Sequence, residues 1–270
     1  MSSLHCGLEH QLDLGRPGTL SRLVTPRAGE GVCPRCFDFY PGPALLCCNC
    51  RRNSDELDAY LPISYSVGGE WLHRQLALYK READPSVPSA CKQLAQLMEA
   101  FLGAHEHCLA AAAGVGGFDL ITTVPSGSAH PARDNHHPLR ELVASLPVAE
   151  GRYRRILYPG LHRGVERRYD RLRYFPFADL SGAAVLLVDD LWTTGTSAQS
   201  AAIALRSAGA RVVAVVTIGR HLNRAWGNND RLLRALDGDF SFQHCALCMT
   251  GAVAGREKER PLSPRGRQGP

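Results

Sequence analysis

The chain has 270 residues, 44% hydrophobic and 21% charged, which is enough apolar material for a packed core and excludes a wholly disordered protein. It has no apolar run of about eighteen residues, so the sequence predicts no membrane span. Its N-terminus has neither a basic segment nor an apolar core and does not resemble a secretory signal. The expected location is therefore cytoplasmic, where the 10 cysteines are expected as metal ligands or core thiols rather than disulfides.

The formal net charge is +5, and its composition is unusual. Only three of the 31 basic residues are lysines: Lys80, Lys92 and Lys258. A base-composition bias that favours arginine codons is one explanation. The other is anion binding, because the planar guanidinium group binds phosphate through two hydrogen bonds.

Composition divides the chain into four parts. Residues 1–32 lack periodicity and are predicted to be a flexible leader. Residues 33–60 are rich in cysteine and are predicted to be a small zinc-ribbon module. Residues 61–238 have the texture of an α/β domain. Residues 239–270 contain another cysteine pair and end in a polar, proline-rich tail that is predicted to be disordered.

Hydrophobic periodicity predicts the main elements in chain order. Apolar residues at helical spacing predict helices over 70–81 and 94–109, and an apolar run before Pro-Ser-Gly predicts a strand over 119–124. A strand, a helix and a strand follow over 183–188, 198–208 and 211–218. Both of these strands are apolar on both faces, as parallel strands are, which predicts a right-handed βαβ unit. The expected fold class is α/β, with an open, mostly parallel sheet and flanking helices.

An acidic pair and a hydroxyl-rich loop lie between the first strand and the helix of this unit. The pair is Asp189 and Asp190, and the loop is Thr193, Thr194, Gly195, Thr196 and Ser197. Such a loop at a helix N-terminus offers backbone N–H groups, hydroxyls and a positive dipole, which suits a phosphate. The carboxylates would repel a phosphate, so they are expected to face sugar hydroxyls or a metal bridging to them. The alternative is a capped helix with surface aspartates.

The stretch VLLVDDLWTTGTS resembles the signature of the type I phosphoribosyltransferases, which bind 5-phosphoribosyl 1-pyrophosphate (PRPP). The resemblance implies that Asp189 and Asp190 are catalytic residues that face the ribose hydroxyls. It also implies that the loop of residues 193–197 holds the 5-phosphate. Trp192 occupies a variable position of the signature, where it either covers the ribose or packs in the interior.

The order of motifs along the chain is similar to that of the ComF-type, competence-related phosphoribosyltransferases. The order is a cysteine knot, a helix ending in Leu-x-x-Tyr-Lys, a strand ending in Val-Pro, and the PRPP loop. The resemblance implies that the turn at Pro125, Ser126 and Gly127 binds pyrophosphate, with Arg140 and His137 as further candidates. This chain lacks the second proline and the Arg-Gly-Phe-Asn run that the family carries after that turn.

Two functions follow from the resemblance. The first is Mg²⁺-dependent transfer of a phosphoribosyl group from PRPP to a small-molecule nitrogen acceptor, with release of pyrophosphate. The Mg²⁺ ion would be held by the pyrophosphate and water rather than by a protein cage. The second is a protein without turnover that uses the same site to sense PRPP or to handle nucleic acid during DNA uptake.

Residues 152–173 contain eight arginines, and four tyrosines lie among them or directly after them: Tyr153, Tyr158, Tyr169 and Tyr174. The family order implies a mobile flap that closes over the reacting centre. Arginine with aromatic residues is also typical of surfaces that bind single-stranded nucleic acid. A solvated basic face in an arginine-rich chain is the third interpretation.

Two C-x-x-C pairs, Cys33 with Cys36 and Cys47 with Cys50, have the spacing of a tetrahedral zinc ribbon. All four positions are filled, which predicts a structural Zn²⁺ site. A third pair, Cys245 and Cys248, is consistent with half of a second metal site, a redox pair or two buried thiols.

Overall fold

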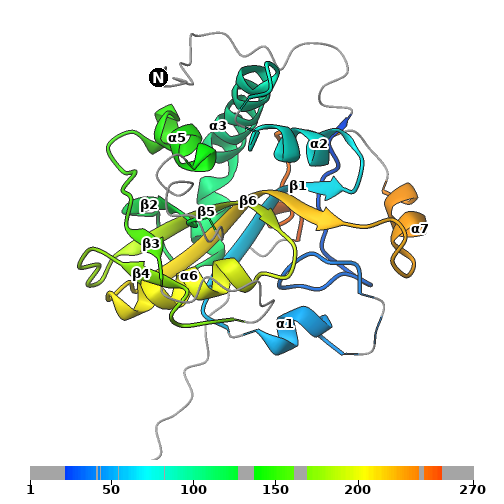
Figure 1. Ribbon diagram of the computed structural model, residues 1–270. Coiled ribbons are helices and arrows are strands. Elements are labelled where there is room, and N and C mark those ends of the chain that lie inside the picture. Colours follow the sequence, from blue (N-terminus) through cyan, green and yellow to red (C-terminus); the bar gives the residue numbers. More distant parts are fainter. Residues whose placement is uncertain are drawn as a thin grey trace, which may run out of the picture.

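The computed structural model contains a four-stranded parallel sheet with helices on both faces (Figure 1). It describes residues 22–40, 42, 44–53, 55–81, 83–126, 137–160, 169–236 and 240–250. The strands are β1 (Ala59–Val67), β2 (Leu120–Thr123), β5 (Ala184–Trp192) and β6 (Val212–Leu222), and their order across the sheet is β1-β6-β5-β2. All three neighbouring pairs are parallel, so their carboxyl ends share one edge. The α/β class and the mostly parallel sheet are therefore confirmed.

The helices form a layer on each side of this sheet. On one side lie α2 (Trp71–Leu78), α3 (Val87–Ala112) and α5 (Pro138–Ala144), and on the other lie α6 (Thr196–Ser207) and α1 (Cys48–Arg52) (Figure 1). Shorter elements are η3 (Pro147–Ala149), α7 (Asn229–Arg234), η4 (Cys248–Thr250) and a two-stranded hairpin of β3 (Leu157–Pro159) and β4 (Tyr174–Pro176). Within the described residues, no helix is long and apolar enough to cross a membrane.

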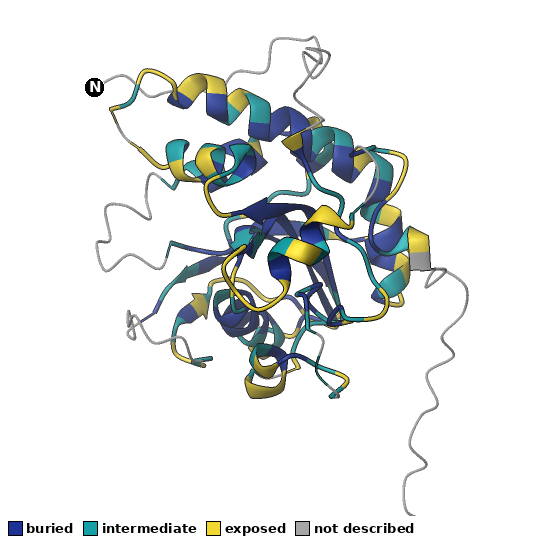
Figure 2. Cartoon of the chain, turned by 90° about the vertical axis from the view of Figure 1, so that its right-hand side faces the viewer, coloured by how far each residue is buried: buried dark blue, intermediate teal, exposed yellow. Residues whose placement is uncertain are grey.

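The sheet lies in the interior because both of its faces are covered. Residues 185–188 of β5 and 213–216 of β6 are fully buried, and Figure 2 shows the sheet as a dark band between the helix layers. This explains why both strands are apolar without alternation. The helix that joins them, α6, completes the predicted βαβ unit.

Both strands of this unit are longer than the sequence predicts. Beyond Val188, the polar residues of β5 keep their pairing with β6, with Asp189 opposite Thr217 and Trp192 opposite Arg220. A strand continues as long as its neighbour offers backbone partners, and hydrophobic periodicity does not report those partners. The acidic pair therefore lies inside the strand and not in the following loop.

The beginning of the described chain differs from the predicted leader. Val24 lies beside β1, where its amide donates to Ser64 Oγ (2.9 Å) and the Tyr65 amide donates to Val24 O (2.9 Å). Leu23 is buried in the same core. One buried apolar side chain and the hydrogen bonds of Val24 to Ser64 and Tyr65 hold a part of the chain that shows no periodicity. Residues 1–21 lie outside the described residues, as does the predicted tail from 251 onward.

The cysteine-rich segment packs on the main domain and does not form a separate one. Phe37 contacts Tyr60 and Phe39 contacts Tyr65, with ring centroids 5.9 and 5.3 Å apart. The Tyr65 hydroxyl also donates to the carbonyl of Phe37 (2.9 Å). Two residues of this segment as predicted, Ala59 and Tyr60, belong to β1 of the main sheet.

Candidate functional site at the carboxyl edge of the sheet

The acidic pair of β5 has two different environments. Asp190 is buried, accepts a hydrogen bond from the Tyr79 hydroxyl and forms an ion pair with Lys80. Burial by itself raises the pKa of the Asp190 carboxyl, but the Lys80 charge and the Tyr79 hydrogen bond lower it further, so the net pKa is below its usual value. Asp190 is thus held as a carboxylate by the end of α2.

Asp189 is only partly buried and has no such pair of donors in the described structure. Burial and then the neighbouring Asp190 carboxylate raise its pKa, while Lys80 and Arg173 oppose the increase. Its Oδ1 accepts the backbone N–H of Asp190 (2.9 Å). The charge of Asp189 is therefore incompletely compensated, and a cation or hydroxyl donors at this edge would stabilise it.

Sequence reasoning missed Tyr79 and Lys80 as members of this site. The two residues were noted only as part of a motif that ends a helix, more than 100 residues before the aspartates. The signal that could have found Lys80 is its rarity, since it is one of three lysines in a chain that uses arginine elsewhere. Its side chain is 46% exposed, so it reaches Asp190 from the surface.

The hydroxyl-rich loop forms a tight turn into α6. Gly195 has a φ of 83° and precedes the first helical residue, Thr196. The hydroxyls of Thr194 and Thr196 lie 2.9 Å apart and share a hydrogen bond. Thr193 is exposed, while Thr194 and Ser197 are partly buried. The loop thus has the hydroxyls and the helix N-terminus that the sequence predicts for an anion site.

Trp192 gives Gly195 a structural role as well. The indole ring is buried and stacks on Tyr60, with centroids 4.2 Å apart. A Cβ at position 195 would lie 2.2 Å from Cζ2 of that ring, and the positive φ would strain any other residue. Of the two roles considered for Trp192, the structure shows packing. A larger residue at 195 would disturb this packing whether or not a ligand binds.

The turn after β2 lies next to the loop. The Tyr174 hydroxyl in β4 donates to Pro125 O (3.5 Å) and interacts with the Ser197 side chain. Burial raises the pKa of Tyr174 to about 12, so it acts as a neutral donor. Ser126 is partly buried, and Gly127 lies outside the described residues. The structure therefore brings one end of the predicted pyrophosphate turn to the predicted phosphate loop.

The two downstream candidates lie at the start of α5. His137 directly precedes the helix. Burial raises the pKa of Asp190, the Lys80 charge lowers it, and the His137 charge adds a smaller effect in the same direction as Lys80. Arg140 is partly buried in the first turn. Lys80, Arg173 and His137 therefore place basic groups near the carboxylates.

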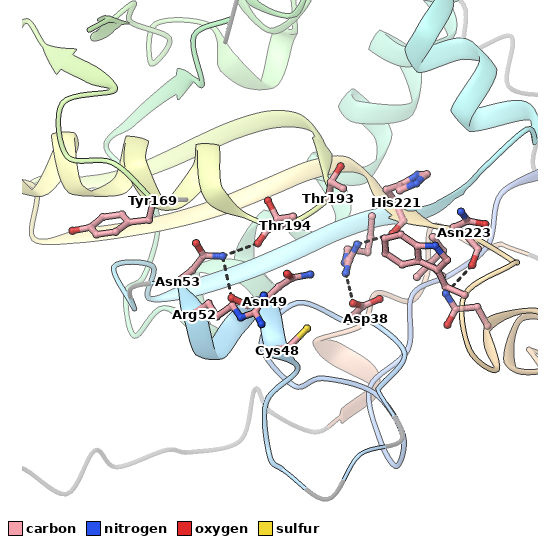
Figure 3. Close-up of a pocket in the computed structure, with 14 residues that line it drawn as sticks. Asp38, Cys48, Asn49, Arg52, Asn53, Tyr169, Thr193, Thr194, His221 and Asn223 are labelled. Carbon is pink, nitrogen blue, oxygen red and sulfur yellow. Dashed lines mark hydrogen bonds and ion pairs between the residues drawn. The ribbon is translucent and has the colours of Figure 1, made fainter. Parts of the chain in front are cut away.

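A cavity of about 1120 Å³ adjoins the other side of the loop (Figure 3). Thr193 and Thr194 line it together with residues of α1 and of the β6 end, among them Asn49, Arg52, Asn53, His221 and Asn223. Neither aspartate is among the described residues that line it. Asn53 Nδ2 donates to Thr194 O (2.9 Å), so the cysteine-rich segment contacts the loop directly.

The four predicted zinc ligands converge. Their Sγ atoms all lie within 4.8 Å of one another, all four residues are buried, and Cys36 Sγ lies 3.6 Å from Cys47 Sγ. Two sulfurs on a tetrahedral zinc lie about 3.8 Å apart when each bond is about 2.3 Å. Cys33, Cys36, Cys47 and Cys50 can therefore hold a metal ion such as zinc, in a closed site with a structural role.

The arginine-rich stretch is divided between several roles. Arg152 forms a two-pronged ion pair with Glu106 of α3 (2.6 and 2.9 Å), which is structural. Arg155 lies over the Tyr158 ring (4.3 Å), and Arg171 Nε donates to the Tyr169 hydroxyl (3.0 Å). Residues 161–168 lie outside the described residues.

No protein-family model matches the chain, and no curated protein matches its sequence. The resemblance to phosphoribosyltransferases therefore rests on the motifs quoted from the sequence.

Proposed function

We propose that the carboxyl edge of the sheet binds PRPP in a type I phosphoribosyltransferase-like fold and supports Mg²⁺-dependent transfer of the phosphoribosyl group to a nitrogen acceptor. The observation that carries the proposal is the arrangement at the β5–α6 junction. Three features follow one another within nine residues, 189–197. They are a partly exposed carboxylate, a buried carboxylate paired with a lysine, and a hydroxyl-rich helix N-terminus. This order suits a ligand with hydroxyls at its centre and a phosphate at one end.

The two aspartates would have different tasks in this mechanism. Asp189 would accept hydrogen bonds from the ribose hydroxyls, which would stabilise its undercompensated charge. Asp190 would act as a positioning residue, because its carboxylate is already bound by Tyr79 and Lys80. Loss of pyrophosphate from the anomeric carbon develops positive charge on the sugar, as glycoside cleavage does. Carboxylates beside the sugar favour that charge.

The phosphate groups would lie at the two ends of the site. The loop of residues 193–197 would hold the 5-phosphate with hydroxyls and the N-terminal amides of α6. The turn at Pro125 and Ser126, with Arg140, would face the pyrophosphate, with Lys80 beside it. Holding both ends of the donor orients the reacting carbon toward the acceptor.

The residues present fit a Mg²⁺ ion bound together with the ligand. Mg²⁺ prefers oxygen ligands and is commonly held by one or two carboxylates with substrate phosphates and water. Asp189 offers such a carboxylate at the edge of the sheet. When bound, the ion would neutralise negative charge on the pyrophosphate.

Titration calorimetry of the full chain with PRPP and Mg²⁺ tests the proposal. We expect Asp189→Asn to weaken PRPP binding by roughly one to two decades, because a charge-assisted hydrogen bond contributes about 1.5–3 kcal/mol. Ribose 5-phosphate is expected to compete, and Thr194→Val, which removes one loop hydroxyl, to weaken both ligands. An acceptor screen for released pyrophosphate then tests turnover.

The exposed Asp179 provides the matched control. Its carboxylate bonds only locally, to the Ser181 amide and hydroxyl (3.0 and 2.6 Å), so Asp179→Asn is expected to bind PRPP as the wild type does. If the wild type shows no heat of binding with PRPP and Mg²⁺, the proposal is wrong. Equal affinities of the Asp189 and Asp179 variants would remove Asp189 from the site.

A second candidate function, binding of single-stranded nucleic acid, is favoured by the β3–β4 hairpin. Phe175 and Phe177 are 44% and 84% exposed there, although phenylalanine is normally buried. Phe177 meets the Tyr158 ring edge-on (6.0 Å), and Arg155 lies on the same ring. Exposed aromatic rings beside arginines are typical of surfaces on which bases stack.

Fluorescence anisotropy with a labelled single-stranded oligonucleotide separates the two functions. If the hairpin binds nucleic acid, Phe177→Ala is expected to weaken oligonucleotide binding by roughly 5–150-fold, the effect of losing one stacked base at about 1–3 kcal/mol. PRPP affinity is expected to stay unchanged. An oligonucleotide affinity that Phe177→Ala leaves intact would contradict a role for the hairpin.

A further inference from the structure

A second group of side chains that could bind a metal shares no residue with the group of four cysteines. His105 and Cys108 project from α3, and Cys245 and Cys248 belong to the C-terminal segment. One ligand atom from each of the four lies within 4.8 Å of the other three. His105, Cys108 and Cys245 are buried, and Cys248 is partly buried.

We propose that His105, Cys108, Cys245 and Cys248 form a second zinc site that fastens the C-terminal segment to α3. The proposal does not depend on the proposed function. It resolves the three interpretations of the Cys245–Cys248 pair in favour of a metal site, and it gives Cys108, which resembles a core residue in the sequence, a ligand role.

The spacing of the donor atoms fits tetrahedral zinc. His105 Nδ1 lies 3.7 Å from Cys108 Sγ. With bonds of about 2.3 Å to sulfur and about 2.0–2.1 Å to nitrogen, a tetrahedral zinc places these two atoms about 3.6 Å apart. Residues three apart on a helix lie on the same face, so α3 supplies two ligands from adjacent turns. Three sulfurs and one nitrogen in tetrahedral geometry favour zinc among the common divalent ions.

The second nitrogen of His105 supports the assignment of a ligand. His105 Nε2 lies 3.0 Å from the carbonyl oxygen of Phe242, which fixes the proton on Nε2. The lone pair is then on Nδ1, the atom that lies next to the Cys108 thiol. A histidine that binds a metal commonly donates its other N–H to a carbonyl in this way. Phe242 belongs to the same segment that the site would fasten.

The backbone around Cys245 and Cys248 directs an amide group at each of the two sulfur atoms. The Cys248 amide donates to Cys245 Sγ (3.4 Å), and the Cys245 amide donates to Cys248 Sγ (3.0 Å). Amide donors directed at sulfur stabilise the thiolate, which is the form that binds metal. A redox pair needs an accessible, reactive thiol, whereas Cys245 is only 1% exposed.

Elemental analysis tests the proposal on the full chain, purified with a reductant and then dialysed against trace zinc. We expect two zinc ions per wild-type chain, one for each group of four ligands. Cys245→Ser with Cys248→Ser is expected to retain one, and so is His105→Gln. The exposed His107, whose Nε2 lies 3.3 Å from Cys108 Sγ, provides the control, and His107→Gln is expected to keep both ions.

Wild-type protein supplies a second measurement, since a variant at a buried position can fail to fold. X-ray absorption at the zinc edge is expected to show seven sulfur ligands and one nitrogen ligand for two ions, against sulfur alone for the first site. One zinc per wild-type chain with sulfur ligands alone would overturn the proposal. So would two ions that remain in the Cys245→Ser, Cys248→Ser variant, or loss of an ion in His107→Gln but not in His105→Gln.

Discussion

Replacing Arg220 by methionine is expected to lower the free energy of unfolding by about 3–5 kcal/mol and Tm by about 6–20 °C. The side chain is only 2% exposed, and its guanidinium group forms an ion pair with Asp38 (2.9 Å). It also donates to the carbonyl oxygens of Cys36 (2.8 Å), Trp192 (3.2 Å) and His221 (2.6 Å). Methionine would leave a partly buried carboxylate and three carbonyls without their donor, and an ion pair with a buried partner is costly to break in this way.

Arg220 connects the first cysteine group to the candidate site. One of its nitrogens lies 3.9 Å from Cys36 Sγ, and another binds the last residue of β5, just before the loop. We therefore expect Arg220→Met to release zinc at a lower chelator concentration than the wild type. Arg220→Lys is expected to fall between the two, because an ammonium group cannot serve all these acceptors with the fixed fork of a guanidinium.

Arg224 provides the matched control four residues further along. It binds Glu70 and Asp230, but its side chain is 41% exposed, so these ion pairs are expected to contribute about 1 kcal/mol or less. Thermal unfolding of Arg220→Met and Arg224→Met side by side checks the prediction. Similar Tm values for the two variants would show that Arg220 is not a central support of the fold.

The elements that could be predicted from the sequence are those whose signal lies within one short segment. The strand over 183–188 and the helix over 198–208 were visible because their residues are apolar or small in unbroken runs. The first zinc group was predictable because both of its C-x-x-C pairs lie within 18 residues, 33–50. The sequence also indicated that the polar residues after each strand would lie at one edge of the sheet, because parallel strands have their carboxyl ends at the same edge.

Contacts between distant segments could not be predicted in the same way. His105 contacts the carbonyl of Phe242, 137 residues away, and Tyr79 donates to Asp190, 111 residues away. The local sequence around each of these residues does not indicate its partner. Only the packing of α3 and α2 on the sheet brings them together. Trp192 lies only three residues before Gly195, but its ring stacks on the distant Tyr60, and this contact was not visible in the local sequence.

The two aspartates are expected to respond in opposite directions when each is changed to asparagine without ligand. Asp190→Asn removes a carboxylate that Tyr79 and Lys80 stabilise, and we expect a loss of about 1.5–3 kcal/mol and a lower Tm. Asp189→Asn removes a charge that burial and Asp190 disfavour. Its Tm is expected to rise, by about 2–4 °C for each kcal/mol of relief.

The effect of Asp189 on stability depends on pH in a defined direction. Burial, with the Asp190 charge, raises the pKa of Asp189 from its usual 3.8 to about 8. Between these values the folded protein binds a proton that the unfolded chain does not, so the carboxyl makes the protein less stable as pH rises through this window. The Tm advantage of Asp189→Asn should therefore grow from pH 4 to pH 8 and level off above it.

Two measurements separate a role in stability from a role in PRPP binding. They are differential scanning calorimetry of both variants from pH 4 to pH 8, and titrations with PRPP and Mg²⁺ at pH 7.5. Asp189→Asn is expected to be more stable than the wild type and yet to bind PRPP more weakly, the pattern of a residue that serves a ligand at a cost in stability. Asp190→Asn is expected to lose stability, because the asparagine cannot hold Lys80 as the carboxylate does. A loss of stability in Asp189→Asn equal to that in Asp190→Asn would show that both residues serve the fold. The difference between the two aspartates would then carry no information on a ligand.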